Sequence, residues 1–340
     1  MKEFKAGKNE AGQRLDKYLK KILPNASMGF IYKMLRKKNI KLNDKKASGT
    51  EIVSVDDKIK IFLSDDTFAK FSVNEDRLMK DFKALSALKT DGLGVVYEDD
   101  DILAANKPVN MLSQKSKETD ISANERLIGY LIKEGKLDFD TYKSFKPSVC
   151  NRLDRNTSGI IAAGKTMKGL QELSSHFKER TLTKYYICIV AGKIDKRQLI
   201  KGYLYKDKKL NKVTICQTLP KGRDTSEYLP IETEYIPVAY SDNATLLKVH
   251  LITGRSHQIR AHLASINHPL AGDYKYGKAS FNRRFTDKYN CKSQLLHSYE
   301  LNIPDMDIHI HTDIPDIFLN ILKGENIWQP GIQEVLEALH

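Results

Sequence analysis

Cysteine is scarce in this chain of 340 residues, and the cysteines present are far apart. They stand at Cys150, Cys188, Cys216 and Cys291, and no two of them form a Cys-x-x-Cys pair. This spacing argues against a zinc finger and against a disulfide framework alike. It is typical of a protein in a reducing compartment, and we predict a cytoplasmic location.

Long apolar runs are also missing, which argues against a membrane protein. The sequence contains no run of about 18 apolar residues of the kind that spans a bilayer. The N-terminus Met1-Lys2-Glu3-Phe4-Lys5 leads into polar sequence rather than the apolar region of a signal peptide. We therefore expect no membrane partner.

Signatures of cofactors and metals are equally lacking. There is no Gly-rich phosphate loop, and His257, His262 and His268 are spaced so that they do not share one helical face. The run of aspartates at 99–101 predicts a hairpin turn, because neighbouring carboxylates on an exposed turn cannot all reach one ion. We expect neither a metal nor a cofactor.

Positive charge is what the sequence has in excess. The chain carries 56 Lys and Arg against 43 Asp and Glu, a net charge of +13. Residues 1–65 alone hold 16 Lys and Arg against 8 Asp and Glu. Such an imbalance indicates a polyanionic partner such as nucleic acid. The alternative is a solvated lysine-rich surface with no partner, since charge runs are often no more than that.

The basic N-terminal region predicts two helices and a small sheet. Leu15, Tyr18, Leu19 and Ile22 recur on one helical face, and Pro24 with Asn25 ends that helix. Ser27 can cap a second helix. Alternating residues then predict strands at 40–43, 52–55 and 59–61. Four cations are expected on the exposed helix faces and are candidate nucleic-acid contacts: Lys17, Lys33, Arg36 and Lys37.

The rest of the chain divides by composition. Residues 66–90 are polar and predict a linker with a short helix near 78–88. A second folded unit is predicted over 91–324, beginning with strand-like runs at 95–97 and 102–105. Residues 325–340 form a C-terminal tail with a short helix predicted at 332–339.

One carboxylate in the second unit stands between two arginines. The stretch Arg152-Leu153-Asp154…Thr157-Ser158-Gly159 is followed directly by the apolar strand 160–163. Nearby cations favour the charged form of a carboxylate, so Asp154 is a candidate nucleophile or base. A turn cap with two solvated arginines is the alternative for an arbitrary Asp in this setting.

Two further segments carry candidate site residues. In the strand predicted at 183–192, alternation sends Tyr186, Cys188 and Val190 to one side and Tyr185 to the other. A tyrosine there is commonly a core residue. In Thr253 to Leu263, Ser256 can cap a helix whose backbone amides would favour a nearby anion.

The stretch around Asp154 resembles the catalytic motif of the RluA family of pseudouridine synthases, in particular its RluC- and RluD-like members. The family usually has His where this chain has Asn151. Both side chains donate and accept hydrogen bonds, so a structural role survives the exchange, whereas a protonation role would not. Residues 1–65 are similar to the alpha-L RNA-binding domain, which many members carry at this end.

Two other motifs support the resemblance. Lys184-Tyr185-Tyr186 is similar to the family's Lys-x-Tyr, whose Tyr stacks on the target base, and this implies that Tyr186 does so here. The segment from Gly254 to Arg260 is similar to Gly-Arg-x-His-Gln-x-Arg, whose final Arg pairs with the catalytic Asp. Arg260 is the matching residue.

The resemblance implies an α+β fold. It places the catalytic domain on a large mixed, mostly antiparallel sheet flanked by helices and loops, after a small RNA-binding domain of two helices and a sheet. The implied reaction isomerises uridine in RNA to pseudouridine without cofactor or metal. Asp154, Tyr186 and Arg260 are the implied catalytic residues. Further substrate or RNA contacts are expected at Arg152, Arg255, His257, Gln258 and Leu296.

Three alternatives stay open from the sequence. Asp154 acts on the ribose either by attacking the anomeric carbon or by removing the neighbouring sugar proton. Large-subunit ribosomal RNA is favoured as substrate because family members with the alpha-L domain commonly modify it, and transfer RNA is the other candidate. A non-catalytic RNA-binding or assembly factor could keep the same fold. No protein partner is implied, and a monomer is the default.

Overall fold

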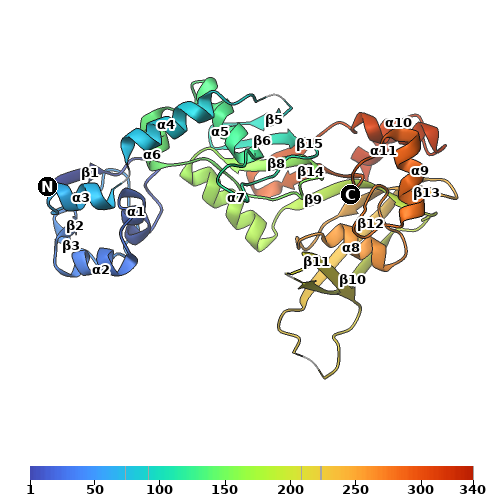
Figure 1. The fold of residues 1–340 in the computed structure, drawn as a ribbon, viewed down its shortest axis with the longest axis horizontal. Coiled ribbons are helices and arrows are strands. Elements are labelled where there is room, and N and C mark those ends of the chain that lie inside the picture. Colours follow the sequence, from blue (N-terminus) through green and yellow to red (C-terminus); the bar gives the residue numbers. More distant parts are fainter. Residues whose placement is uncertain (73, 91, 208, 223, 340) are drawn as a thin grey trace.

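The chain contains two β-sheets, each with its own helices (Figure 1). The structure is a computed structural model that describes residues 1–72, 74–90, 92–207, 209–222 and 224–339. A small domain at the N-terminal end precedes a larger domain built on a long, mostly antiparallel sheet. The predicted α+β fold is confirmed. None of the helices in the described ranges is long and apolar enough to cross a membrane.

The small domain packs two helices against a sheet of strand order β1-β4-β2-β3. Apolar side chains on one face of each helix, such as Leu19 and Ile31, meet Ile59 of the sheet in a buried core. Ser27 caps the second helix by accepting a hydrogen bond from the amide of Phe30, as predicted. The elements are β1 (Lys2–Lys5), α1 (Leu15–Ile22), α2 (Met28–Arg36), β2 (Ile40–Leu42), β3 (Lys45–Lys46) and β4 (Lys58–Ile61).

The prediction of a strand at 52–55 is wrong. Ile52 makes an isolated bridge with Arg14, and the amide of Val53 bonds the carbonyl of Gln13. The segment therefore pairs with the turn before α1 instead of joining the sheet. A one-residue bridge does not extend because the amide of Ser54 bonds the side chain of Asp57 in the following turn.

Most of the described part of the predicted linker lies in two helices that pack in different directions. Helix α3 (Asp65–Phe71) belongs to the small domain, where Phe68 and Phe71 lie against Phe4 and Phe30. Helix α4 (Glu75–Ser86) packs Phe82 against the larger domain. It begins earlier than the predicted helix because the side chain of Asn74 caps it. The domain boundaries stay a prediction.

The large sheet has the order β11-β10-β12-β13-β9-β14-β8-β6-β5, with β15 pairing with β14 and β7 with β8. Strand β8 runs parallel to β14, and this pair joins the two halves of the sheet. The β10–β11 hairpin projects from the body of the domain (Figure 1). The strands are β5 (Gly94–Glu98), β6 (Ile102–Lys107), β7 (Ser148–Val149), β8 (Ser158–Gly164), β9 (Thr183–Ala191), β10 (Gln198–Asp207), β11 (Lys212–Cys216), β12 (Leu229–Tyr240), β13 (Ala244–His250), β14 (Leu296–Ile303) and β15 (Ile308–His311).

Helices cover both faces of this sheet. Alternation along β9 holds as predicted, because Tyr186, Cys188 and Val190 pack towards α8 while Ile187 and Ile189 face the opposite core. Helices α4, α5 and α6 cover one face of the β6–β8 half, and α7 covers the other. The remaining helices are α5 (Ala123–Lys133), α6 (Phe139–Ser144), α7 (Met167–Glu179), α8 (Gln258–Ser265), α9 (Ala279–Tyr289), the short 3-10 helix (Pro304–Met306), α10 (Asp316–Gly324) and α11 (Ile332–Ala338).

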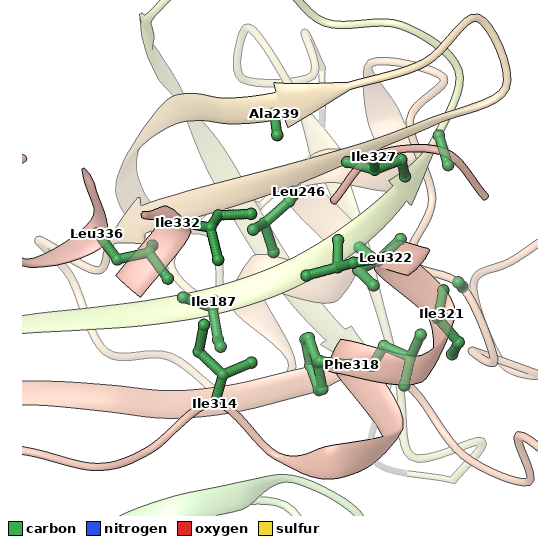
Figure 2. Close-up of a cluster of buried hydrophobic side chains, with 14 of the residues drawn as sticks. Ile187, Ala239, Leu246, Ile314, Phe318, Ile321, Leu322, Ile327, Ile332 and Leu336 are labelled. Carbon is green, nitrogen blue, oxygen red and sulfur yellow. The ribbon is translucent and has the colours of Figure 1, made fainter. Parts of the chain in front are cut away.

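The C-terminal tail is part of a core. Figure 2 shows Ile327, Ile332 and Leu336 packed with Ile187 and Leu246 of the sheet. A buried ion pair sits beside this cluster. Lys248 Nζ lies 2.7 Å from Glu300 Oε2, and the same ammonium donates to the backbone carbonyls of Leu336 and Leu339. Lys248 therefore fixes the C-terminal end of α11 to β13.

We predict that Lys248→Met destabilises the fold. The substitution removes the ammonium from Glu300 Oε2 and from two backbone carbonyls of the tail, while His309 still bonds Glu300 Oε1 at 3.1 Å. Removing one partner of a buried pair costs about 3–5 kcal/mol. Urea unfolding followed by circular dichroism measures the change. Lys201→Met is the matched control, because its pair with Glu232 is exposed and should contribute little. A loss as small as that of the control would contradict the anchoring role of Lys248.

Candidate active site

The loop between β7 and β8 carries Asp154, and its neighbours hold it rigidly. Asn151 donates through its amide to the carbonyl of Ile160 at 3.0 Å and accepts from the amide of Ala162 at 2.8 Å. Ser113 bonds both the amide and the carbonyl of Leu153, at 2.9 and 3.0 Å. Asn151, which stands where the family usually has His, therefore ties the loop to β8 by hydrogen bonds alone.

A buried lysine supports the same loop from beneath. Lys107, at the end of β6, has no exposed surface and donates to the carbonyls of Pro108, Met111 and Arg155. Burial lowers the pKa of Lys107 to about 8, and the negative charge of Asp154 opposes that shift. The loop that carries Asp154 therefore contacts the buried cation Lys107 and also contains Arg152 and Arg155.

Arg260 of α8 lies between two carboxylates. Its Nη1 donates to Asp154 Oδ2 at 2.7 Å, so the pair implied by the sequence motif is present. Its Nε and Nη2 donate to both oxygens of Asp273, at 2.7 and 3.0 Å. Burial alone would lower the pKa of Arg260, but its hydrogen bonds to Asp273 and the charges of Asp273 and Asp154 raise it above its ordinary value.

Asp273 is fully buried and fixes the direction of the guanidinium. Its Oδ1 also accepts from the backbone amides of Lys275 and Tyr276. Burial favours the neutral acid, but the hydrogen bonds and charge of Arg260 outweigh it and lower the pKa of Asp273. Arg260 is therefore held on one side by a rigid anion and presents its remaining Nη1 donor to Asp154.

The parallel pairing of β8 with β14 brings further motif residues together. Gly159 has φ +108°, and a Cβ there would lie 2.2 Å from the carbonyl oxygen of Ser298, so the two backbones approach too closely for any side chain. Ser158 bonds His297 Nδ1 at 2.8 Å, and His297 Nε2 bonds Thr312 at 2.7 Å. This explains why small residues follow Asp154.

Tyr186 and Leu296 form an apolar wall beside Asp154. Both are buried in one core cluster and line the same cleft as Asp154, which has a volume of about 880 Å³. Burial raises the pKa of Tyr186 to about 12, and the charge of Asp154 adds to the shift. The phenol therefore stays neutral. Tyr185 points to the other side of β9, against His250.

The start of α8 differs from the prediction. Ser256 does not cap the helix; the capping position is His257, which has a left-handed backbone with φ 55°. Gln258 takes over the local hydrogen bonding. Its carboxamide accepts from Thr253 and from the amide of Arg255. The same group donates to the carbonyl of Glu232 and to Thr233.

The cleft is lined by cations from several elements. Arg255 and the exposed Arg152 border it, and further basic residues surround it, namely Lys115, Lys178, Arg180, Lys184 and Lys206. Burial lowers the pKa of Lys184 to about 8. The predicted contacts of the small domain lie elsewhere: Lys17 is exposed on α1, and Lys33, Arg36 and Lys37 are exposed on or just after α2. No group of three or more potential metal ligands occurs among the described residues.

Sequence reasoning assigned no site role to three residues of this site: Lys107, Asp273 and Tyr276. A signal for Asp273 existed, because an arginine expected to be buried beside one carboxylate generally needs more partners than one. Tyr276 lies with its ring 5.2 Å from the Arg260 guanidinium and its hydroxyl 2.8 Å from His257 Nδ1. No local pattern indicates that contact, since it depends on the loop after β13 meeting the loop after α8.

Comparison with known proteins gives the same assignment. A family model described as RNA pseudouridylate synthase matches residues 101–265. An RNA pseudouridine synthase of Mycoplasma genitalium is 33% identical over 308 residues, which cover 90% of this chain and 90% of that protein. A Rickettsia bellii protein named ribosomal large subunit pseudouridine synthase C is 32% identical over 268 residues, covering 78% of this chain and 82% of that protein.

A solved structure shares the fold. Human RNA pseudouridylate synthase domain containing 4 superposes with a TM-score of 0.58 at 18% identity, covering 74% of this chain and 99% of that one. Fold, motifs and relatives together define an enzyme class, the isomerases that act on uridine in RNA. This chain belongs to the RluA family of RNA pseudouridine synthases.

We predict that acid destabilises the fold partly through His297. Burial lowers the pKa of His297 to about 3, whereas an unfolded histidine has a pKa of about 6.5. Between these values the unfolded chain binds the proton and the folded chain does not. The contribution of neutral His297 is therefore complete above pH 6.5 and is lost as the pH falls towards 3, by about 1.4 kcal/mol per pH unit.

Urea unfolding at a series of pH values tests this contribution. The variant His297→Asn should show a shallower decline below pH 6.5 than the natural protein. His311→Asn is the control, because His311 is exposed on β15 and should leave the slope unchanged. Equal slopes for the natural protein and His297→Asn would contradict the prediction.

Proposed function

We propose that this enzyme isomerises specific uridines of large-subunit ribosomal RNA to pseudouridine, using its own side chains without a cofactor. The observation that carries the proposal is the Asp154 carboxylate, held by Arg260 at 2.7 Å beside Tyr186 in a cleft lined with cations. The reaction breaks the bond from C1′ to N1, turns the uracil and joins C1′ to C5. Because it is an isomerisation, no atom is added from outside.

Each residue at the centre of the cleft has a proposed role. Asp154 acts on the ribose, either by attacking C1′ or by removing the neighbouring sugar proton. Arg260 orients Asp154 and balances its charge. Tyr186 gives a flat surface for the uracil to stack on; its raised pKa makes it a poor source of phenolate, which favours stacking over removal of the C5 proton. Leu296 closes the apolar side of the base pocket.

The target nucleotide must leave its stack to enter this cleft, at a cost of a few kcal/mol. Cations at the rim, including Arg152 and Arg255, would offset this cost by contacting phosphates. We assign Gln258 to holding the loop before α8, because its carboxamide is engaged by protein groups and is 2% exposed. It is thus a support for the RNA-facing residues.

The choice of ribosomal RNA rests on the relatives and on the small domain. Two relatives, from Rickettsia bellii and Vibrio cholerae, are named ribosomal large subunit pseudouridine synthase C. The small domain offers Lys17, Lys33 and Lys37 on exposed helix faces. Arg36 and Lys46 line a shallow groove beside Tyr32, a combination of cations and an aromatic ring that suits RNA. Work on ribosomal RNA would place the enzyme in the cytoplasm.

Asp154→Asn tests the chemistry. The substitution is nearly isosteric and removes the carboxylate charge, so we expect no pseudouridine from the variant while RNA binding stays within about threefold of the natural protein. Pseudouridine formation is measured on transcripts of large-subunit ribosomal RNA and on transfer RNA in parallel. Turnover by Asp154→Asn would refute the assignment of Asp154.

The RNA chosen by the natural enzyme distinguishes the remaining alternatives. Conversion of ribosomal transcripts supports the proposal, whereas conversion of transfer RNA alone keeps the chemistry and overturns the substrate. Tight RNA binding with no conversion of either RNA by the natural protein would indicate a non-catalytic binding or assembly role.

The small domain makes a separate prediction about salt. Replacing Lys33, Arg36 and Lys37 together by Gln should weaken RNA binding and reduce the magnitude of the slope of log K against log salt concentration. The reduction should reach about 2.1 to 2.7 if all three contact phosphates, because each lost phosphate contact removes about 0.7 to 0.9. Fluorescence anisotropy at several salt concentrations measures both quantities.

A triple variant with the same charge change serves as the control. Lys278, Arg283 and Lys292 are exposed on or beside α9, which covers the sheet face opposite α8. Their replacement by Gln should leave the slope within error of the natural protein. An equal loss of slope in both triple variants would show that overall charge, not the α2 surface, accounts for the effect.

A further inference from the structure

A chain of hydrogen bonds leads from the β10–β11 hairpin to the active-site carboxylate. The backbone amide of Val213 donates to the hydroxyl oxygen of Tyr276 at 3.0 Å. The same hydroxyl lies 2.8 Å from His257 Nδ1. On the other side of the ring, His257 Nε2 lies 3.9 Å from Asp154 Oδ1. That oxygen is the one that Arg260 leaves free, since Arg260 bonds Oδ2.

These contacts favour one of the two tautomers of a neutral His257. A backbone amide can only donate, so the Tyr276 oxygen accepts from Val213 and has its own proton to donate. His257 Nδ1 lies 2.8 Å from this hydroxyl, and the tautomer in which Nδ1 accepts uses both the acceptor and the donor capacity of Tyr276. Nδ1 of a neutral imidazole that accepts a hydrogen bond carries no proton, so the proton is on Nε2. His257 therefore points an N–H donor towards the free oxygen of Asp154.

The charges around His257 agree with a neutral ring. Burial lowers its pKa, and the positive charges of Arg260, Lys275 and Lys206 act in the same direction. Asp154 is the group that opposes them. The Tyr276 hydroxyl, donating to Nδ1, adds to the preference because protonation of Nδ1 would break that hydrogen bond.

The 3.9 Å gap is too long for a hydrogen bond between His257 and Asp154, but one oxygen atom can lie within reach of both. Such an atom must accept from His257 Nε2–H and donate to Asp154 Oδ1. A phosphate or carbonyl oxygen only accepts, and the N3–H of uracil only donates. A hydroxyl does both. Within an RNA chain the free hydroxyl of the ribose is the 2′-hydroxyl, because the others are esterified or part of the ring.

We propose that His257 and Asp154 together hold the 2′-hydroxyl of the target ribose, and that Tyr276 sets His257 for this contact. The inference rests on the proposed function and adds a means by which the site selects ribose over deoxyribose, since the 2′-hydroxyl is what tells RNA from DNA at one position. It also gives the hairpin strand β11 a part in the site, through the amide of Val213.

A mutant cycle between protein and substrate tests the contact. The probes are two synthetic RNAs that span a uridine converted by the natural enzyme, one all-ribose and one with 2′-deoxyuridine at that single position. Single-turnover rates and dissociation constants are measured for the natural protein and for His257→Ala, so that a substrate too slow to turn over is still compared through binding. The cycle isolates the contact from the intrinsic reactivity of each sugar.

We expect the effect of replacing His257 to depend on the presence of the 2′-hydroxyl in the substrate. His257→Ala should slow the ribose substrate, or weaken its binding, by about tenfold, and should change the deoxyribose substrate by less than about twofold. Tyr276→Phe should affect the ribose substrate selectively but less strongly, because the imidazole of His257 then loses the hydroxyl group that favours its Nε2–H tautomer. His257→Gln, which keeps an N–H donor, should recover part of the loss.

Other outcomes overturn the inference. An equal loss on both substrates in His257→Ala and in His257→Gln would mean that His257 supports the fold of the site without touching the 2′-hydroxyl. His311→Ala, on the exposed edge of β15, should change neither substrate. If the natural protein converts no uridine in the all-ribose RNA, the proposed function fails first and the inference falls with it. If the natural protein converts the all-ribose RNA but the cycle shows no coupling between His257 and the 2′-hydroxyl, the inference is overturned and the proposed function stands.

Discussion

The arrangement of the whole site depends on one guanidinium held between two carboxylates. Asp273 is fully buried and is itself fixed by two backbone amides, so Arg260 has one orientation that satisfies it. Nη1 then points at Asp154. This contact joins the loop after β7 to helix α8 and to the turn at 271–277. Without the buried anion, a long arginine side chain would be free to follow the RNA phosphates instead.

In the same arrangement, the attraction of RNA and the action of a carboxylate on the sugar fall to different groups. Asp154, Arg260 and Asp273 together carry a formal charge of −1, so these three groups do not by themselves attract phosphate. Attraction of RNA is left to cations at the rim of the cleft, such as Lys178, Arg180 and Arg255, and to the small domain. A polyanion can therefore be held firmly while a carboxylate at the centre stays available to act on the sugar.

Local patterns in the sequence predicted the parts whose geometry is local. The helix 15–22 and the alternation along β9 follow from periodicity, and the Asp154–Arg260 pair followed from motifs that resemble a known family. The strand predicted at 52–55 failed because its hydrogen bonds go to a turn, which composition does not reveal. The roles of Asp273 and Tyr276 were not predicted because their partners lie 13 and 19 residues away, beyond the reach of helix or strand periodicity. The helix of the C-terminal tail was predicted, but its packing was not, because its partner Lys248 is 88 residues from Leu336. Polar residues at 66–90 concealed α3 and the early start of α4, because their few aromatic residues pack onto different domains.

Mapping pseudouridines across total RNA tests the central claim most directly. Carbodiimide-based sequencing compares cells that have this gene, cells that lack it, and cells that lack it but carry the natural or the Asp154→Asn form. The account predicts that defined positions of large-subunit ribosomal RNA lose pseudouridine without the gene and regain it with the natural form alone. Unchanged pseudouridines in every RNA, in cells without a related redundant enzyme, would contradict it.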